Sequence, residues 1–247
     1  IEDYSRCPRA YKLAFGSPPL RVSSFKYLAF LESLLYTNAI LETVWREIKE
    51  KHKNLATEDF SKMATKTLTK EAKAILQILL DIDPGFIMIP AHIWTPWFAV
   101  FGSKSGYNSM EECFEELTPH IRSAETGLSS DPNMNHRLSQ LDNITLVSNS
   151  DAHSLNNLGR EANVFLLNDA DINYNEITRI IKEGDRKKFL YTIEFYPEEG
   201  KYHHDGHAVC GVCLTPKETK AKKLLCPKCK KPVTVGVLHR VEDLADR

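Results

Sequence analysis

Two C-x-x-C pairs near the C-terminus constrain this chain more than any other feature of its sequence. Cys210 and Cys213 form the first pair, Cys226 and Cys229 form the second, and 12 residues lie between the pairs. Two such turns can surround one tetrahedral Zn²⁺ with four thiolates. The alternatives are two disulfides or a redox motif. Disulfides form in oxidising compartments, and the chain begins with no secretory signal, which disfavours both alternatives. We therefore expect a structural zinc on the four cysteines.

This zinc is expected to contribute mainly to folding, because about thirty residues cannot bury much core alone. Three nearby histidines are alternative zinc ligands: His203, His204 and His207. They are not needed if all four cysteines bind the ion. The remaining cysteines, Cys7 and Cys113, are isolated in the sequence, and we expect both to be buried free thiols.

The composition is that of an ordinary globular protein. Of the 247 residues, 42% are hydrophobic and 26% charged, which excludes disordered, collagen-like and disulfide-miniprotein classes. The net charge of -1 gives no general argument for nucleic-acid binding, although it leaves a local basic patch open. No apolar run reaches the ~18 residues of a membrane span. The start is not a signal peptide, so we expect no membrane partner and a cytoplasmic location.

The chain is expected to divide into three parts. Residues 1–66 form a helical N-terminal segment, with a helical pattern over 24–50 and a polar linker over 51–66. Residues 67–200 form an α/β domain, and residues 201–247 form the zinc-binding module. Residue 1 is Ile and not Met, so we expect a processed chain or a piece of a longer one.

The α/β assignment rests on strands that alternate with helices. A helical pattern begins at Thr69 and ends at Asp83-Pro84-Gly85; Ser109 and Glu112 form a capping box for a second helix, which runs to Ile121. A third helix is expected over 174–182. Strands are expected over 86–89, 121–124, 144–147, 164–167 and 189–195. This alternation predicts parallel strands, in a barrel or in an open sheet.

Reactive groups in such folds lie just beyond the C-terminal ends of strands. His92 follows the first strand, Glu125 ends the short one, and Asp151 and His153 follow the strand at 144–147. A carboxylate and an imidazole two residues apart are a good metal pair. Together the four predict a site with one or more metals, although a lone His after a strand is often a hydrogen-bonded structural residue.

These same stretches resemble a known family. PAHIWTPW at 90–97, ETG at 125–127 and NSDAH at 149–153 are similar to the later metal motifs of the PHP (polymerase and histidinol phosphatase) superfamily. GSKSG at 102–106, GREAN at 159–163, IEFYPEEGKYH at 193–203 and LHRV at 238–241 resemble its endonuclease Q-like branch. The resemblance covers about residues 69–247. It implies a partial or distorted PHP-type (β/α) barrel joined to a zinc module.

The resemblance also implies a metal-dependent DNA repair endonuclease that cuts beside deaminated bases such as hypoxanthine or uracil. Zn, Mn or Mg would bind His92, Glu125, Asp151 and His153, and His92, Asp151 and His153 would be catalytic. Four residues are candidates for contacts with phosphate or DNA: Lys104, Arg160, Tyr202 and His203. The alternative for Lys104 and Arg160 is that they are solvated surface cations. The alternative for Tyr202 and His203 is that their stretch only packs the zinc module against the barrel.

One family motif is missing. The superfamily opens with His-x-His on its first strand, and the first 85 residues contain no such motif. Either those strands lie elsewhere in a longer parent protein, or the chain is a degenerate relative that retains the scaffold. The expected partners besides DNA are therefore a longer parent chain or a repair partner. Residues 4–12, YSRCPRAYK, resemble instead the opening of PD-(D/E)xK modules associated with UvrD-type helicases. An amphipathic helical cap is the alternative for this segment.

Two other functions stay open at this point. The first is a PHP phosphoesterase that acts on small phosphate monoesters. The second is a nonenzymatic, zinc-stabilised DNA-binding module or a UvrD-type helicase-associated module.

Overall fold

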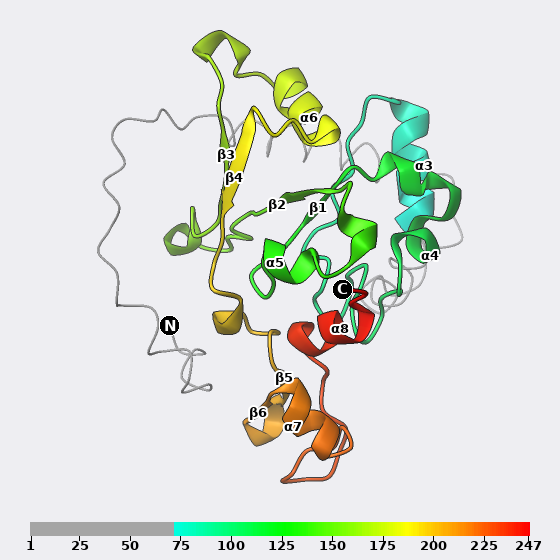
Figure 1. Cartoon of the computed structure of the whole chain (residues 1–247), viewed down its shortest axis with the longest axis vertical. Coiled ribbons are helices and arrows are strands. Elements are labelled where there is room, and N and C mark those ends of the chain that lie inside the picture. The colour runs from blue at the N-terminus through cyan, green and yellow to red at the C-terminus, as the bar shows by residue number, and fades with distance from the viewer. Residues whose placement is uncertain (1–71) are drawn as a thin grey trace, which may run out of the picture.

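The computed structural model describes residues 72–247 (Figure 1). The predictions for residues 1–66, including Cys7 and the resemblance at 4–12, lie outside this range. The helices are α3 (Ala72–Ile82), α4 (Met110–Phe114), α5 (Pro132–Asn135), α6 (Tyr174–Glu183), α7 (Pro216–Ala221) and α8 (Val237–Leu244). The strands are β1 (Ser123–Glu125), β2 (Thr145–Val147), β3 (Ala162–Phe165), β4 (Phe189–Ile193), β5 (Asp205–His207) and β6 (Val212–Leu214).

The strands form three two-stranded sheets. β1 and β2 are parallel, whereas β3–β4 and β5–β6 are antiparallel. The mixed helix and strand content agrees with the α/β prediction, but the expectation of parallel strands throughout is wrong for the β3–β4 pair. Over residues 72–247 the strands do not close into a barrel.

The strand expected at 86–89 is absent, because its segment makes too few ladder bonds. The chain that follows directly flanks β1: Glu125 N donates to Pro90 O at 3.0 Å, and Ile93 N donates to Glu125 O at 3.2 Å. Pro90 has no N–H to extend the ladder. The segment still carries His92 to the end of β1, as the predicted strand would have done.

The helix expected from Ser109 to Ile121 is shorter than predicted. Ser109 Oγ accepts from Glu112 N at 3.0 Å, which is the expected cap of α4. Glu115 then adopts a positive φ of 49°, and the chain continues as a 3₁₀ helix, η4 (Glu115–His120), that contains Pro119. Of the residues that the pattern placed on one helical face, Cys113 therefore lies in α4, Leu117 lies in η4, and Ile121 caps the end of η4.

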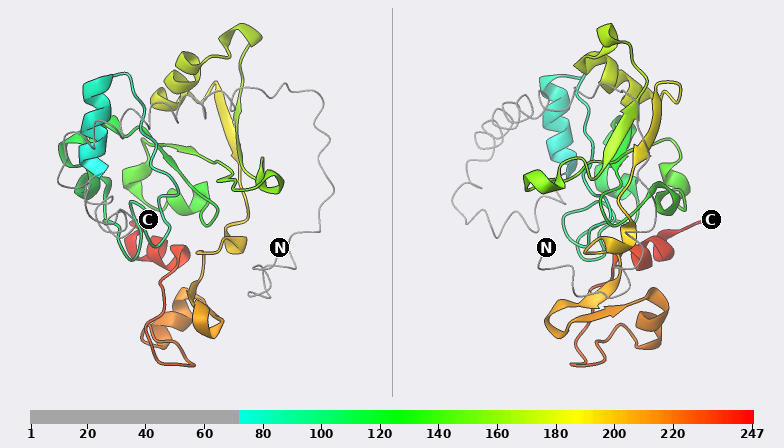
Figure 2. Two further views of the ribbon diagram at one scale, coloured as in Figure 1. Left: turned by 180° about the vertical axis from the view of Figure 1, so that it is seen from behind. Right: turned by 90° about the vertical axis from the view of Figure 1, so that its left-hand side faces the viewer.

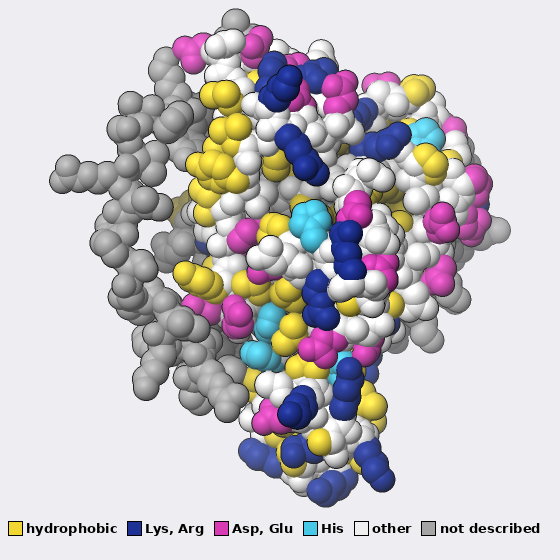
Figure 3. Space-filling view, viewed as in Figure 1, with side chains coloured by type: hydrophobic (Ala, Val, Ile, Leu, Met, Phe, Trp, Pro, Cys, Tyr) yellow, Lys and Arg dark blue, Asp and Glu magenta, His cyan; other side chains and the backbone are white. Residues whose placement is uncertain are grey.

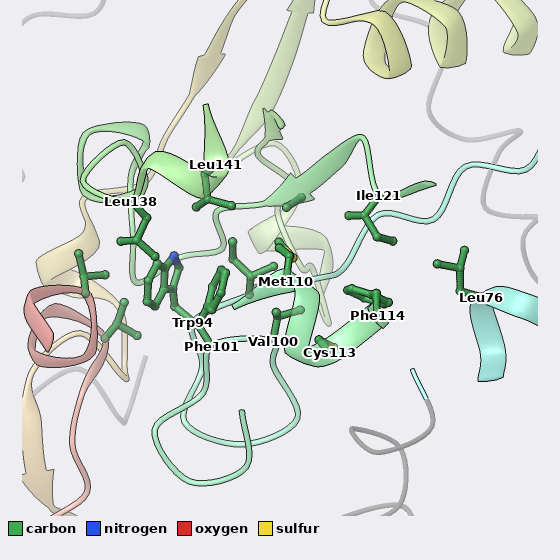
Figure 4. Close-up of a cluster of buried hydrophobic side chains, with 14 of the residues drawn as sticks. Leu76, Trp94, Val100, Phe101, Met110, Cys113, Phe114, Ile121, Leu138 and Leu141 are labelled. Carbon is green, nitrogen blue, oxygen red and sulfur yellow. The ribbon is translucent and has the colours of Figure 1, made fainter. Parts of the chain in front are cut away.

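One apolar core unites the main body (Figure 4). Trp94 and Phe101 lie at its centre with ring centroids 4.8 Å apart, and Trp94 Nε1 donates to Asn135 Oδ1 at 2.7 Å. Cys113 is buried here as expected, and burial raises the pKa of its thiol to about 12. Val237 and Val241 of α8 are fully buried in the same core. The last helix therefore packs with the body although it follows the cysteine-containing segment.

Residues 201–236, called here the C-terminal module, project from the body (Figure 2). Their apolar core is small and consists of Leu214, Cys226 and Val233. A complete capping box at Thr215 and Glu218 starts α7. The buried carboxylate of Asp205 accepts a hydrogen bond from Gly236 N at 2.6 Å and lies 2.6 Å from His239 Nδ1. These two contacts join the module to α8. Within the described range, no helix combines the length and apolar character needed to cross a bilayer.

Candidate functional site

Four side chains of the C-terminal module converge in a metal-binding arrangement. The ligand atoms of His207, Cys210, Cys226 and Cys229 all lie within 4.8 Å of one another. His207 ends β5, and Cys210 ends a short 3₁₀ helix, η9 (Ala208–Cys210). Cys229 Sγ lies 3.8 Å from His207 Nδ1. Three thiolates and one imidazole are a donor set that suits tetrahedral zinc.

Cys213, which the sequence predicts as a ligand, is not part of this group. The β5–β6 register explains why: His207 pairs with Val212, and Cys213 pairs with Gly206. Paired residues share a face of a sheet and successive residues alternate, so His207 and Cys213 project to opposite faces. The structure thus brings together three of the four predicted cysteines, with His207 in the fourth position.

The thiols of this group influence one another's ionisation. The neighbouring Cys229 thiol, and then burial, raise the pKa of Cys210 to about 11. Burial opposes ionisation of Cys226, but the N–H groups of Cys229 and Lys228 donate to it and lower its pKa overall. Adjacent thiolates repel each other in the absence of a positive charge. A bound divalent cation would allow all three thiols to ionise.

The four predicted ligands of the α/β domain lie in two pairs. His92 N donates to Glu125 Oε2 at 2.7 Å. Asp151 Oδ1 lies 3.9 Å from His153 Nδ1, and both side chains are exposed. Among the described residues, no three of these four ligands bring their donor atoms within 4.8 Å of one another. They therefore do not form a complete metal site by themselves.

Two of these four residues have unusual backbone geometry. His92 has a φ of 30° and Asp151 a φ of 45°, which place both among seven non-glycine residues with positive φ in the described range. Such conformations cost about 1–3 kcal/mol each and cluster at functional sites. Gly127, at φ 71°, packs directly against His92: a Cβ there would meet His92 Cβ at 2.7 Å. His92 Nδ1 is buried without a hydrogen-bond partner. An orphaned imidazole nitrogen is what a missing ligand would leave.

An asparagine network links Glu125 to the loop that follows β2. Asn149 Nδ2 donates to Glu125 Oε1 at 2.9 Å, and Asn149 Oδ1 accepts from Asn163 Nδ2 at 3.1 Å. Asn163, on β3, also bonds both backbone groups of Ser148 at 2.9 Å. Both asparagines fall inside the motifs at 149–153 and 159–163, although the motifs predict no role for them. The network fixes the Glu125 carboxylate and the start of the loop that carries Asp151.

Arg160 contacts the same loop from its other side. Its Nε donates to Ser150 O at 2.8 Å, and its guanidinium lies 5.9 Å from the centroid of the Phe195 ring. Arg160 is predicted from the sequence to contact a phosphate, and that role stays a prediction. The partners it has here are backbone oxygens of the loop.

The other predicted DNA contacts have different surroundings. Lys104 is exposed. Tyr202 is half-buried and makes an edge contact with Trp97, with ring centroids 6.2 Å apart. His203 is only 3% exposed, and its Nδ1 lies 3.0 Å from Ser129 O. Tyr202 and His203 therefore pack the module against the body, and their contact with DNA stays a prediction.

Two buried carboxyl groups near the network were missed by the sequence analysis. Glu161 is 3% exposed, and its Oε1 accepts from Phe195 N at 3.2 Å. Glu194 Oε2 accepts from Thr126 Oγ1 at 3.1 Å. The second oxygen of each is buried without a partner. Burial raises the pKa of Glu161 to about 7 and also raises that of Glu194. No sequence spacing marks these residues, because only their burial makes them unusual.

No protein-family model matches the chain. By sequence it is 35% identical over 166 residues to YqxK of Bacillus subtilis (strain 168), an uncharacterized protein, covering 67% of this chain and 40% of that protein. It is 32% identical over 180 residues to the uncharacterized MJ0043 of Methanocaldococcus jannaschii, covering 70% of this chain and 22% of that protein.

The solved structures decide the fold. The chain superposes on the lesion-specific endonuclease Q of Pyrococcus furiosus with a TM-score of 0.60 and 31% identity, over 71% of this chain and 42% of that one. The fold is endonuclease Q-like. A complex of endonuclease Q with a 27-mer duplex substrate carrying an abasic lesion gives a TM-score of 0.61 and 30% identity over the same shares. The chain thus spans about two fifths of these endonuclease Q structures and of YqxK.

Proposed function

We propose that this chain is part of a metal-dependent DNA repair endonuclease that hydrolyses a phosphodiester beside a damaged base, with deaminated bases as the substrate class. The observation that carries this proposal is the endonuclease Q-like fold at 31% identity. Two neighbouring structures are endonucleases, and one of them is described with a DNA duplex.

The residue types at the strand ends agree with this chemistry. A divalent metal at such a site polarises the phosphoryl group and lowers the pKa of a bound water. His92, Glu125, Asp151 and His153 are the residues of this chain that would hold it. Because they lie in two separate pairs, the site needs further ligands beyond the described residues or from solvent.

The roles of the surrounding residues follow from their contacts. Asn149 and the His92 amide orient the two oxygens of Glu125. Asn163 and Arg160 bond the backbone of Ser148 and Ser150, so both restrain the loop that ends in Asp151 and His153. Ligands held in this way lose less conformational entropy when they bind a metal or a phosphate.

In the C-terminal module, we propose Zn²⁺ as a structural ion. His207, Cys210, Cys226 and Cys229 supply the donors. The module's own core is small, so metal binding would provide much of its folding free energy.

A nicking assay tests the proposed activity. A labelled duplex that contains one hypoxanthine, uracil or abasic site is incubated with the chain and Mn²⁺, Mg²⁺ or Zn²⁺, and products are separated under denaturing conditions. We expect a nick beside the lesion and at least a 100-fold loss of rate in Asp151→Asn. Asp169→Asn, an exposed acidic control remote in sequence, should keep the wild-type rate. A chain that binds the duplex without cutting it, or an unchanged Asp151→Asn, would contradict the proposal.

The separation of the two ligand pairs favours one second candidate: a nonenzymatic, zinc-stabilised DNA-binding module. Salt-dependent binding of the same duplex without any nick would support this alternative over the endonuclease.

A further inference from the structure

The charge of the chain is strongly polarised. Residues 201–236 contain eight lysines and two acidic residues, which gives this module a net charge of +6 in a chain of net charge -1. The remaining residues therefore carry -7. One of the two module acids, Asp205, is buried against His239 and offers nothing to the surface. The near-neutral total thus conceals a basic surface, and Figure 3 shows dark blue side chains gathered over the module, whose basic residues are all lysines apart from its histidines.

Five of these lysines form what we call the lysine rim. All five are exposed and have no side-chain hydrogen bond or ion pair within the described part of the chain: Lys217, Lys222, Lys223, Lys230 and Lys231. Two other module lysines differ in this respect. Lys220 lies 3.4 Å from Asp243, and Lys228 donates to Cys210 O at 2.8 Å. Within the described residues, the ammonium groups of the rim lysines are thus not neutralised by an ion pair and are available to an external anion.

Backbone hydrogen bonds tie the two halves of the rim together. Cys226 N donates to Lys231 O at 2.8 Å, and Val233 N donates to Leu224 O at 2.9 Å. The segment after α7, with Lys222 and Lys223, is thereby fixed beside the segment with Lys230 and Lys231.

The turns that present the rim are strained. Lys223 and Lys230 have φ values of 54° and 61°, in the left-handed region that lysine rarely adopts. Strain of this kind persists where the surrounding structure enforces it and is found at functional surfaces. The metal-binding cysteines Cys226 and Cys229 lie between these two positions in the sequence, so a bound metal would fix both turns.

We propose that the lysine rim binds the phosphate backbone of duplex DNA, independently of sequence and of the lesion. This inference rests on the DNA partner in the proposed function and assigns a surface to it. Lysine ammonium groups act as point charges toward phosphates, and contacts of this kind position a protein on DNA. An anionic membrane is a poorer fit, because α7 has only six residues and is too short for an interfacial amphipathic helix.

Fluorescence anisotropy with a labelled, lesion-free 27-mer duplex tests the proposal on the metal-loaded chain. The affinity is measured across a series of NaCl concentrations for the wild type and for Lys222→Gln/Lys223→Gln/Lys230→Gln/Lys231→Gln. Each lost phosphate contact lowers the slope of log K against log [salt] by about 0.9. If all four lysines contact phosphates, we therefore expect the quadruple variant to lose about 3.6 in slope and at least tenfold in affinity. Metal content per chain verifies that the variant module is intact.

A charge-matched pair of variants removes the effect of net charge. Lys230→Gln/Lys231→Gln should weaken binding and lower the slope, whereas Arg186→Gln/Lys187→Gln, two exposed cations on the body, should leave both unchanged. Equal loss in the two pairs, or wild-type binding by the quadruple variant, would overturn the proposal. Tighter rim-dependent binding to phosphatidylserine vesicles than to the duplex would also overturn it. Nicking by a quadruple variant with unchanged affinity would reject the rim and keep the endonuclease.

Discussion

The backbone amide of His92 donates a hydrogen bond to Glu125 Oε2 at 2.7 Å, which joins two predicted metal ligands that lie 33 positions apart in the chain. The contact is made at the amide, and the His92 imidazole keeps a buried Nδ1 without a partner. His92 therefore orients the Glu125 carboxylate through its amide, while its imidazole Nδ1 is free to bind a metal.

Gly127→Ala should destabilise the protein by displacing His92. The new Cβ would lie 2.7 Å from His92 Cβ, which is shorter than real side chains tolerate. Overpacking of this kind costs about 1–3 kcal/mol, in addition to the left-handed backbone penalty of about 1–2 kcal/mol. Urea denaturation measures the free energy of unfolding. Gly159→Ala is the matched control, since Gly159 has a similar φ of 73° and open space around it. Equal losses in the two variants would refute the contact with His92.

Arg160→Ala should lower activity by loosening the loop that carries Asp151. The variant loses a charged hydrogen bond to Ser150 O, worth roughly 1.5–3 kcal/mol. Arg160→Lys should not restore activity, because lysine lacks the planar donor fork. If this role is correct, the salt dependence of DNA binding stays at the wild-type slope. A slope lowered by about 0.9 would instead show that Arg160 contacts a phosphate.

The fourth ligand of the C-terminal metal can be identified with Co²⁺. With His207 in the site, Cys213→Ser should keep the thiolate-to-Co²⁺ charge-transfer band, and His207→Ala should shift the d–d bands and weaken binding. Cys226→Ser serves as the positive control for thiolate loss. A weaker charge-transfer band in Cys213→Ser, with His207→Ala unchanged, would restore the four-cysteine site.

Stability should fall as the pH rises from about 4.5 to about 7, because burial raises the pKa of Glu161 from 4.5 to about 7. In this window the folded protein holds a proton that the unfolded chain releases. Within this window each pH unit lowers the free energy of unfolding by about 1.4 kcal/mol, so the full loss of stability is about 3 kcal/mol.

Glu161→Gln should flatten this dependence and stabilise the protein above pH 7. The amide oxygen still accepts from Phe195 N, and the buried charge is removed. The Tm is measured at intervals from pH 4.5 to 8, with the exposed Glu198→Gln as a control. Glu194, whose pKa is also raised by burial, leaves a smaller slope of the same sign. An unchanged slope in Glu161→Gln would show that Glu161 does not titrate in this window.

The sequence predicts features that depend on local patterns. The apolar spacing over 174–182 predicts α6, and the short run at 144–147 predicts β2; both are confirmed. The parallel β1–β2 pair follows from the alternation of strands and helices. The antiparallel β3–β4 pair does not, because sheet direction depends on contacts far apart in sequence.

The candidate sites divide in the same way. The C-x-x-C spacing locates the metal-binding turns, but the β5–β6 register selects His207, and no spacing encodes that register. Motifs identify His92 and Asp151, whereas the raised pKa of Glu161 arises only from burial. Net charge over the whole chain likewise conceals the lysine rim, since opposite charges on the body cancel it.

The central claim is that the strand ends of the α/β domain bind metal in addition to the C-terminal module. Elemental analysis of metal per chain, on the wild type and on Asp151→Ala/His153→Ala, tests it most directly. We predict that the wild type holds one ion more than the variant, which keeps the single ion of the C-terminal module. One ion per chain in both proteins would contradict the claim and leave only the cysteine-containing site.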